Sequence, residues 1–183
     1  LANQGMVMSG AIDYLAARKA ARFLKLCDSY NMSILNLIDV PGFIPGEEQE
    51  HNGLLRYGAQ LCQGMHTSTP RFSLVVRRCY GAAAYIMMQT RAQGGDMVMA
   101  LKESRIAIMG YEGARNMVYP DIKEGEDKSV EYYENYEDPK LAFKAGMVDQ
   151  IIDIEESREK IVGLVETFQR KRMPDRPFKK HLT

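Results

Sequence analysis

The residues best suited to chemistry in this sequence are the small ones of a turn, and their reactive groups are backbone N–H groups. Arg77 to Met88 reads RRCYGAAAYIMM, so a glycine and three alanines stand between a charged pair and an apolar run. The apolar residues Phe72 to Val76 precede it and predict a buried strand, and Ala82 to Gln89 predicts a short helix. Free N–H groups at a helix start favour negative charge. Two of them aimed at one oxygen make an oxyanion hole, which stabilises charge that develops on a carbonyl.

A second loop, at the end of another apolar run, could face the same site. Ser33 to Val40 (SILNLIDV) is short and almost continuously apolar, as a buried parallel strand is. It runs into Pro41 to Gly46 (PGFIPG), a rigid loop with two Pro–Gly steps. Ligands of open α/β folds bind outside the carboxyl ends of strands, so both turns are expected at one edge of the sheet. The alternative, that the small residues only permit tight packing, stays open on spacing alone.

Charged and histidine side chains near these turns have structural explanations as well as catalytic ones. Asp39 could be an acid or base, but a carboxylate just before a Pro–Gly step more often fixes the loop. Arg77 and Arg78 could attract a carboxylate or phosphate, or could simply be a solvated strand end. We interpret His51 and His66 as surface or structural histidines.

The cysteines predict neither a disulfide nor a metal site. Cys27, Cys62 and Cys79 are odd in number, widely spaced and set in apolar patterns, which favours buried free thiols in a reducing compartment. No Cys-x-x-Cys pair exists, and the three histidines lie at no ligand-like spacing from the cysteines. The methionines at 87, 88, 97 and 99 are interpreted as core residues.

The elements that must position the turns follow from hydrophobic spacing. Ala11 to Tyr30 is expected to be a helix, with an apolar stripe formed by Ile12, Leu15, Ala16, Ala20, Phe23, Leu24 and Cys27. Further helices are expected at Glu47 to Met65, Gly110 to Tyr119, Pro139 to Ala145 and Ser157 to Lys171. Further strands are expected at Asp96 to Leu101, Arg105 to Met109 and Met147 to Ile152. This alternation predicts a single α/β domain, residues 1–183, with a largely parallel sheet.

Three further stretches carry expectations of their own. Gly53, Gly58 and Gly64 each cost about 1 kcal/mol relative to alanine inside a helix, so we expect close packing against another backbone. Pro120 to Tyr136 is the most polar stretch and is expected to be a surface loop or a solvated helix. The basic tail, Met173 to Thr183, is expected to be flexible.

Charge and hydropathy argue against two classes of protein. The 183 residues contain 24 basic and 24 acidic side chains, and this zero net charge argues against binding to nucleic acid or a membrane surface. No apolar run approaches the roughly 18 residues that span a bilayer. We therefore expect a cytoplasmic protein, or one of the mitochondrial matrix if the source is eukaryotic.

Ordered motifs extend over nearly the whole chain. They are Ala2-Asn3-Gln4, Lys19 to Phe23 (KAARF), Asp39 to Gly46, Gln49-Glu50, Tyr80-Gly81, Ile108 to Gly110, and Asp138-Pro139. With them, the sequence resembles the carboxyl-terminal half of the carboxyltransferase subunit of biotin-dependent acyl-CoA carboxylases. That group includes the β subunits of propionyl-CoA and methylcrotonyl-CoA carboxylase, and glutaconyl-CoA decarboxylase. The resemblance implies a crotonase/ClpP-like spiral α/β fold.

The resemblance also implies a site and its partners. In that family the active site lies between a CoA-binding N-terminal crotonase-like domain and a biotin-binding domain of another subunit, in a homo-oligomer. The implied cofactor is biotin, as carboxybiotin on a biotin carboxyl carrier protein, and the implied substrate is an acyl-CoA. The implied catalytic groups are the backbone amides of Ala83 and Ala84. The residues implied to bind biotin or substrate are Gly42, Phe43, Gly81, Ala82, Tyr85, Ile86 and Gly110.

The turn departs from the pattern of propionyl-specific members, in which Gly-Gly-Ala-Tyr is followed by Asp. Here Gly81 to Ile86 reads GAAAYI, which is one residue longer and has isoleucine after the tyrosine. The residue after the tyrosine helps to shape the acyl pocket in the family, so Ile86 argues against a propionyl-specific pocket. The extra residue leaves open which two amides form the hole.

Four functions remain on this reading. The leading one is the biotin-side half of an acyl-CoA carboxyltransferase, inactive on its own. The second is the same chemistry run backwards in a biotin-dependent decarboxylase, and the third is an assembly module without activity. The fourth is a crotonase-like hydratase, for which Glu47, Glu48 and Glu50 would supply carboxylates.

Overall fold

A parallel sheet is the centre of the molecule. The computed structural model describes residues 1–66, 69–123, 125–169 and 171, so the tail that we expect to be flexible lies outside the described residues. The strands are β1 (Ile34–Val40), β2 (Arg71–Tyr80), β3 (Met97–Leu101), β4 (Arg105–Ala107) and β5 (Gln150–Ile152). Their order is β1-β2-β3-β5, with β4 also paired to β2, and each pairing is parallel. The predicted α/β class with a parallel sheet is confirmed.

The register of β2 brings three strand ends together. Its first half, Phe72 to Val75, pairs with β3, and its last residues, Arg78 to Tyr80, pair with β4. On its other side Val40, the last residue of β1, lies opposite Cys79. The carboxyl ends of β1, β2 and β4 therefore lie at one edge of the sheet.

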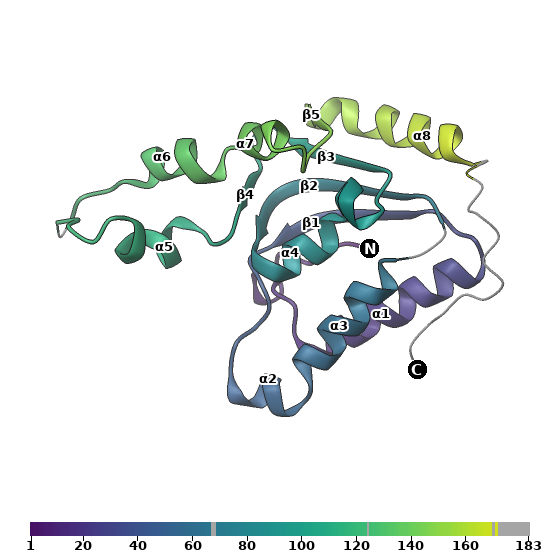
Figure 1. Ribbon diagram of the computed structural model, residues 1–183, viewed down its shortest axis with the longest axis horizontal. Coiled ribbons are helices and arrows are strands. Elements are labelled where there is room, and N and C mark those ends of the chain that lie inside the picture. Colours follow the sequence, from purple (N-terminus) through teal and green to yellow (C-terminus); the bar gives the residue numbers. More distant parts are fainter. Residues whose placement is uncertain (67–68, 124, 170, 172–183) are drawn as a thin grey trace.

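Helices cover both faces of the sheet (Figure 1). They are α1 (Tyr14–Ser29), α2 (Glu47–His51), α3 (Leu54–Gly64), α4 (Gly81–Met88), α5 (Tyr111–Val118), α6 (Ser129–Tyr132), α7 (Pro139–Lys144) and α8 (Ser157–Phe168). Helices α1, α3 and α4 share the larger apolar core with β1 and β2, through residues such as Leu24, Leu61, Met87, Ile38 and Val75. Helix α8 covers the opposite face, where Ile161 and Leu164 pack on Leu74 and Met99.

The buried face of α1 differs from the predicted stripe. Leu15 and Phe23 are 54% and 43% exposed, whereas Ala17 and Ala21 are buried. The prediction is confirmed for Ala20, Leu24 and Cys27 but wrong for these two large side chains, because the helix is positioned by small ones. It lies so close to α3 that a Cβ on Gly64 would be 3.4 Å from Leu24. Side-chain size, and not hydrophobicity alone, decides which face is buried at such a contact.

The single helix expected from Glu47 to Met65 is also wrong, because the chain breaks between α2 and α3. Gly53 has φ 85° and serves as the N-cap of α3, a left-handed conformation that glycine adopts without strain. The expectation of close packing against another backbone is confirmed at Gly64, where a Cβ would be 3.6 Å from the Ala21 carbonyl oxygen. Gly58 is packed closely against a side chain instead, since a Cβ there would be 3.3 Å from the Phe43 ring.

Several strands have other bounds than expected, because hydrophobic runs predict burial and not pairing, and the strand expected at Arg105 to Met109 ends at Ala107. The strand expected at Phe72 to Val76 extends through the charged pair to Tyr80, and the one expected at Met147 to Ile152 begins only at Gln150. The terminal helix ends at Phe168, before the expected Lys171.

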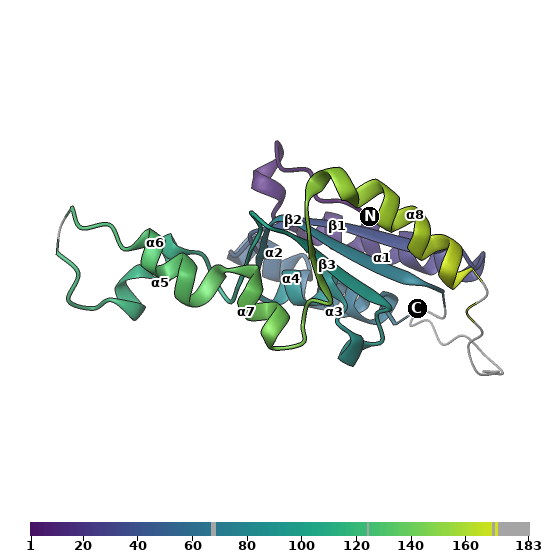
Figure 2. The ribbon, with the colours of Figure 1, turned by 90° about the horizontal axis from the view of Figure 1, so that it is seen from above.

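An arm projects from the sheet between β4 and α7. We use this name for residues 108–123 and 125–138, which include α5, α6 and a π-helix, Tyr133–Glu137 (Figures 1 and 2). Its own small core is Tyr111, Ala114 and Tyr132. The polar stretch expected to be a loop or a solvated helix therefore contains both, but Tyr132 and Glu137 within the arm are buried.

Candidate functional site

The site lies at the edge where β1, β2 and β4 end. Helix α4 follows β2 without a linker, since Tyr80 is both the last residue of the strand and the N-cap of the helix. Gly81 takes φ 68°, and a Cβ there would lie 3.5 Å from the carbonyl oxygen of Ile108, just after β4. The turn therefore needs a residue that tolerates positive φ and leaves room beside the β4 end.

The start of α4 decides which amides are free. With Tyr80 as N-cap, helix geometry leaves the N–H groups of Gly81, Ala82 and Ala83 without a partner inside the helix, and the N–H of Ala84 is the first in position to donate to the carbonyl of Tyr80. Ala82 is exposed and Gly81 is half-buried, whereas Ala83 and Ala84 are 0% and 2% exposed. Ligand access to this helix terminus is therefore greatest at Gly81 and Ala82.

The other residues expected at the site fall into two groups. Tyr85 is 49% exposed, and a Cβ on Gly42 would meet no atom within 4 Å, so both border open space. Phe43 and Ile86 are partly buried and pack against the main core. Gly110 is the N-cap of α5, and a Cβ there would come within 2.9 Å of the Tyr80 ring.

Asp39 joins the ends of β1 and β2. Its carboxylate accepts hydrogen bonds from Arg77 Nη2 at 2.7 Å, from Arg77 Nε at 3.1 Å and from Arg78 Nε at 3.1 Å. Burial acts to raise the pKa of Asp39, but the hydrogen bonds from both arginines outweigh it and hold the pKa below its usual value. These bonds fix the end of β1 to β2, so the structural role expected of Asp39 is seen, with partners on β2 and not in the Pro–Gly loop. Both arginines are paired with this carboxylate, and Arg77 is still 58% exposed, as a solvated strand end is.

A buried carboxylate that sequence reasoning missed lies behind α4. Glu137, at the end of the arm, is 0% exposed and accepts a hydrogen bond from Tyr80 Oη at 2.8 Å. Its other oxygen accepts from Arg105 Nη1 at 3.0 Å. Burial, together with the hydrogen bond to Glu137, raises the pKa of Tyr80, so its hydroxyl stays a donor at neutral pH. Only the acidic character of the stretch was visible in the sequence, because the partners are 57 and 32 residues away.

The thiols are structural. The free cysteines Cys27 and Cys79 are buried and Cys62 is partly exposed. Burial raises the pKa of Cys79 to about 12 and also raises that of Cys27, which keeps both protonated and poorly nucleophilic. Met87 and Met88 are buried in the core, as expected.

Both histidines that the structure describes, His51 and His66, are at the surface. His51 lies 3.9 Å from Glu47 on α2 with both side chains exposed, and His66 is exposed. His181 lies outside the described residues.

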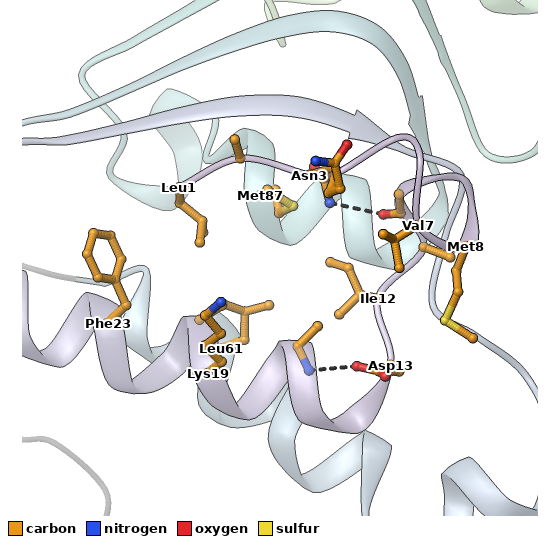
Figure 3. A pocket seen from close by; sticks show the side chains of 16 residues that line it. Leu1, Asn3, Val7, Met8, Ile12, Asp13, Lys19, Phe23, Leu61 and Met87 are labelled. Atoms are coloured by element: carbon orange, nitrogen blue, oxygen red, sulfur yellow. Dashed lines mark hydrogen bonds between the residues drawn. The ribbon is translucent and has the colours of Figure 1, made fainter.

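An apolar cavity of about 560 Å³ lies elsewhere, between the first residues of the chain and α1. Figure 3 shows Leu1, Val7, Ile12 and Phe23 facing into it, with Lys19 on α1 among the lining residues. None of the residues expected at the site lines this cavity.

Two negative findings concern only the described part of the chain. It contains no group of three or more His, Cys, Asp or Glu side chains that could hold a metal ion. None of its helices combines the length and the apolar character required to cross a membrane.

Comparisons with known proteins show the family of the chain. The Carboxyl transferase domain family matches residues 1–183. The chain is 40% identical over 190 aligned residues to the methylmalonyl-CoA carboxyltransferase 12S subunit of Propionibacterium freudenreichii subsp. shermanii, covering 99% of this chain and 36% of that protein. It is 36% identical, with the same coverage, to the methylmalonyl-CoA decarboxylase subunit alpha of Propionigenium modestum. The chain thus spans about a third of the length of these relatives.

Solved structures show the same fold. A transcarboxylase 12S crystal structure, described as a hexamer assembly with methylmalonyl-coenzyme A and methylmalonic acid bound, has a TM-score of 0.89 and 38% identity, covering 100% of this chain and 36% of that one. The β subunit of geranyl-CoA carboxylase from P. aeruginosa has a TM-score of 0.75 and 25% identity, covering 87% of this chain and 36% of that one. The expected crotonase-like α/β fold is confirmed, and the chain belongs to the carboxyl transferase domain family.

Proposed function

We propose that this chain is the biotin-side half of an acyl-CoA carboxyltransferase. The observation that carries the proposal is the N-terminus of α4. It presents backbone N–H groups and small residues at an edge where three parallel strands end, in a chain that the carboxyl transferase family matches throughout. Such an edge is where α/β folds bind ligands.

The chemistry needs a place for negative charge more than it needs an acid or a base. Biotin on its carrier protein would supply the carboxyl group. The amides of α4 would hold the oxygen on which charge develops when that group leaves. Preorganised donors of this kind are worth about 3 kcal/mol each in the barrier. The acyl-CoA and its own oxyanion donors belong to the CoA-binding N-terminal domain in this proposal.

The register of α4 supports Ala82 and Ala83 as the catalytic pair, in preference to Ala83 and Ala84. The N–H of Ala84 is the first that the helix uses internally, so it is not free to face a ligand. The amide of Ala82 is free and its residue is exposed. The N–H of Ala83 has no partner inside the helix, but the residue is buried in this chain. A ligand would therefore reach that amide from the side of Ala82.

The remaining site residues have supporting roles in the proposal. Gly42 and Gly81 leave room for the biotin ring, and half-exposed Tyr85 forms a wall of the pocket. Phe43, Ile86 and Gly110 hold the three loops in place through their packing. These three residues would affect ligand binding because they set where the backbone around the site lies.

The partners follow from how much of the relatives the chain spans. Its relatives are nearly three times as long, and the 12S structure is a hexamer with methylmalonyl-CoA bound. We therefore propose a CoA-binding crotonase-like domain, a biotin carboxyl carrier protein and further copies of the same subunit as partners. A methylmalonyl-CoA-type acyl-CoA is the first substrate to test.

A biotin-dependent decarboxylase is the second candidate, because the Propionigenium modestum relative has that activity in its name. The same amides serve both directions of the reaction. The hydratase reading finds less support, since Glu47, Glu48 and Glu50 are exposed on the short helix α2 and not enclosed around a substrate site.

The test is decarboxylation of methylmalonyl-CoA in the presence of free biotin, with the chain alone and with the CoA-binding domain added. We expect biotin-dependent release of carbon dioxide only when both are present. Activity of the chain alone would refute the split site, and hydration of a crotonyl-type CoA would favour the hydratase. Inactivity of a well-folded pair with every carboxylated acyl-CoA tested would favour the assembly module.

A further inference from the structure

The side chain of Tyr80, the N-cap residue of α4, is held by two contacts. On one side a Cβ on Gly110 would lie only 2.9 Å from Tyr80 Cε2, so the ring lies against the backbone of the β4–α5 turn. On the other side the hydroxyl donates to Glu137 at 2.8 Å. Tyr80 is 8% exposed. Because Tyr80 is also the N-cap of α4, its backbone cannot move without moving the first turn of the helix.

Glu137 is fixed in turn by the arm and by β4. It is the last residue of the π-helix, where the arm returns to the sheet, and it is fully buried. Arg105, the first residue of β4, donates to its second oxygen at 3.0 Å and stacks over the Tyr133 ring with 5.3 Å to the centroid. A buried carboxylate is tolerated only when it is paired and hydrogen-bonded, and both of its oxygens are bound here.

The negative charge of the Glu137 carboxylate bears on how this arrangement could affect the amides of α4. A bare carboxylate behind the N-terminus of α4 would oppose the negative charge that the free amides are proposed to hold. Arg105 neutralises Glu137, so the pair can hold Tyr80 by a hydrogen bond without adding a net negative charge beside the amides. Glu137 is fully buried and Tyr80 nearly so, while the Arg105 side chain is 47% exposed, so the carboxylate is held in place by a partner that reaches in from the surface.

We propose that Tyr80, Glu137 and Arg105 are positioning residues that set the amides of Ala82 and Ala83 and link their placement to the arm. This inference rests on the proposed function. None of the three is proposed to touch biotin or acyl-CoA. They act through the N-cap of α4, so their loss should lower the rate of transfer and leave the affinity for acyl-CoA unchanged.

The matched pair of variants is Tyr80→Phe and Tyr132→Phe. Each removes one hydroxyl from a buried tyrosine that contacts the arm: Tyr80 loses its bond to Glu137, and Tyr132 loses its bond of 2.9 Å to the Met109 carbonyl. Of the two, only Tyr80 is itself the N-cap of α4 and only its hydroxyl bonds to Glu137. Glu137→Gln is the second variant, which keeps the shape of the side chain and removes its charge.

Two readouts test the proposal. The first is kcat and KM for biotin-dependent decarboxylation of methylmalonyl-CoA, with the CoA-binding domain present. Tyr80→Phe and Glu137→Gln should lower kcat on the order of tenfold with KM for the acyl-CoA unchanged, since misplaced catalytic groups cost rate, and Tyr132→Phe should keep both values. The second is the ¹⁵N–¹H spectrum of the 183-residue chain labelled at alanine, in which the Ala82 and Ala83 signals should move in Tyr80→Phe and Glu137→Gln but not in Tyr132→Phe.

The two readouts separate this proposal from the proposed function. Wild-type protein without biotin-dependent activity would refute the function, while shifted alanine amides in Tyr80→Phe would still support the positioning network. Unmoved amides, unchanged kcat, or a fall in kcat equal to that of Tyr132→Phe would each overturn the network.

Discussion

The sheet and the arm are held together by different forces. The sheet lies between two apolar clusters, and side chains such as Ile38, Val75 and Leu24 are completely buried. The arm has only Tyr111, Ala114 and Tyr132 as its core and depends on polar contacts where it meets the sheet. The difference teaches that the backbone of the site is fixed by non-directional burial, whereas its fine position depends on a few directional bonds.

The largest effect that separates the two regions should come from removing a core side chain. Ile38→Ala in β1, at 0% exposure, should lower the free energy of unfolding by about 2–5 kcal/mol. Ile108→Ala at the start of the arm, where the same residue type is 84% exposed, should change it by less than about 0.5 kcal/mol. Urea unfolding followed by circular dichroism gives both values. Equal losses would mean that the arm is covered and buried in solution.

The next largest effect on stability should come from the contact between the arm and the sheet, where Gly110 lies against Tyr80. Gly110→Ala keeps an ordinary φ of −75° but places a Cβ 2.9 Å from the Tyr80 ring, so it should cost about 1–3 kcal/mol of stability by overpacking. Gly113→Ala, three residues on in α5, meets only Met109 at 3.8 Å and should stabilise the helix by about 0.5–1 kcal/mol. Thermal unfolding of both variants measures the difference, and a neutral Gly110→Ala would show that the ring has room to move.

A smaller, pH-dependent effect belongs to the strand ends. The pKa of Asp39 is below its usual value in the folded state, so its contribution to stability is complete above the unfolded pKa of about 3.9. It is lost as the pH falls through the lower, folded pKa. The wild-type protein should therefore lose more stability than Asp39→Asn between pH 6 and pH 3, in urea unfolding at several pH values. Parallel curves for the two proteins would show that Arg77 and Arg78 do not hold this carboxylate.

The sheet was easier to predict from the sequence than the arm, because apolar runs are visible in a sequence and long-range polar contacts are not. The β-branched runs of β1 and β2 predict a parallel sheet, and the Pro–Gly loop after β1 predicts at which edge of the sheet the candidate site lies. Part of the buried face of α1 was predicted wrongly because Ala17 and Ala21 are buried owing to their small size. A hydrophobic stripe reflects hydrophobicity and not size. The break before α3 was missed because a glycine in an acidic, helix-like stretch has the same letter whether it packs or ends a helix.

The fine geometry of the site was beyond sequence reasoning for a physical reason. Which amides are free depends on the residue at which α4 begins, and it is only with Tyr80 as N-cap that we propose Ala82 and Ala83 in place of Ala83 and Ala84. Glu137, the residue after the polar stretch, could not be singled out, because its partners Tyr80 and Arg105 come from distant strands. The small-residue turn itself could be recognised, and the motifs that carry the family resemblance extend over both regions.

The most direct test of the central claim is removal of one free amide. Ala82→Pro deletes the N–H at the second position of α4 without breaking a bond inside the helix, since proline is accepted in a first turn. Glu47→Pro does the same at the exposed start of α2, away from the proposed amides. With the CoA-binding domain present, biotin-dependent decarboxylation of methylmalonyl-CoA should fall by about 10²–10³-fold in Ala82→Pro and stay near wild type in Glu47→Pro. A folded Ala82→Pro protein with wild-type kcat would contradict the account, because the start of α4 would then hold no charge in the reaction.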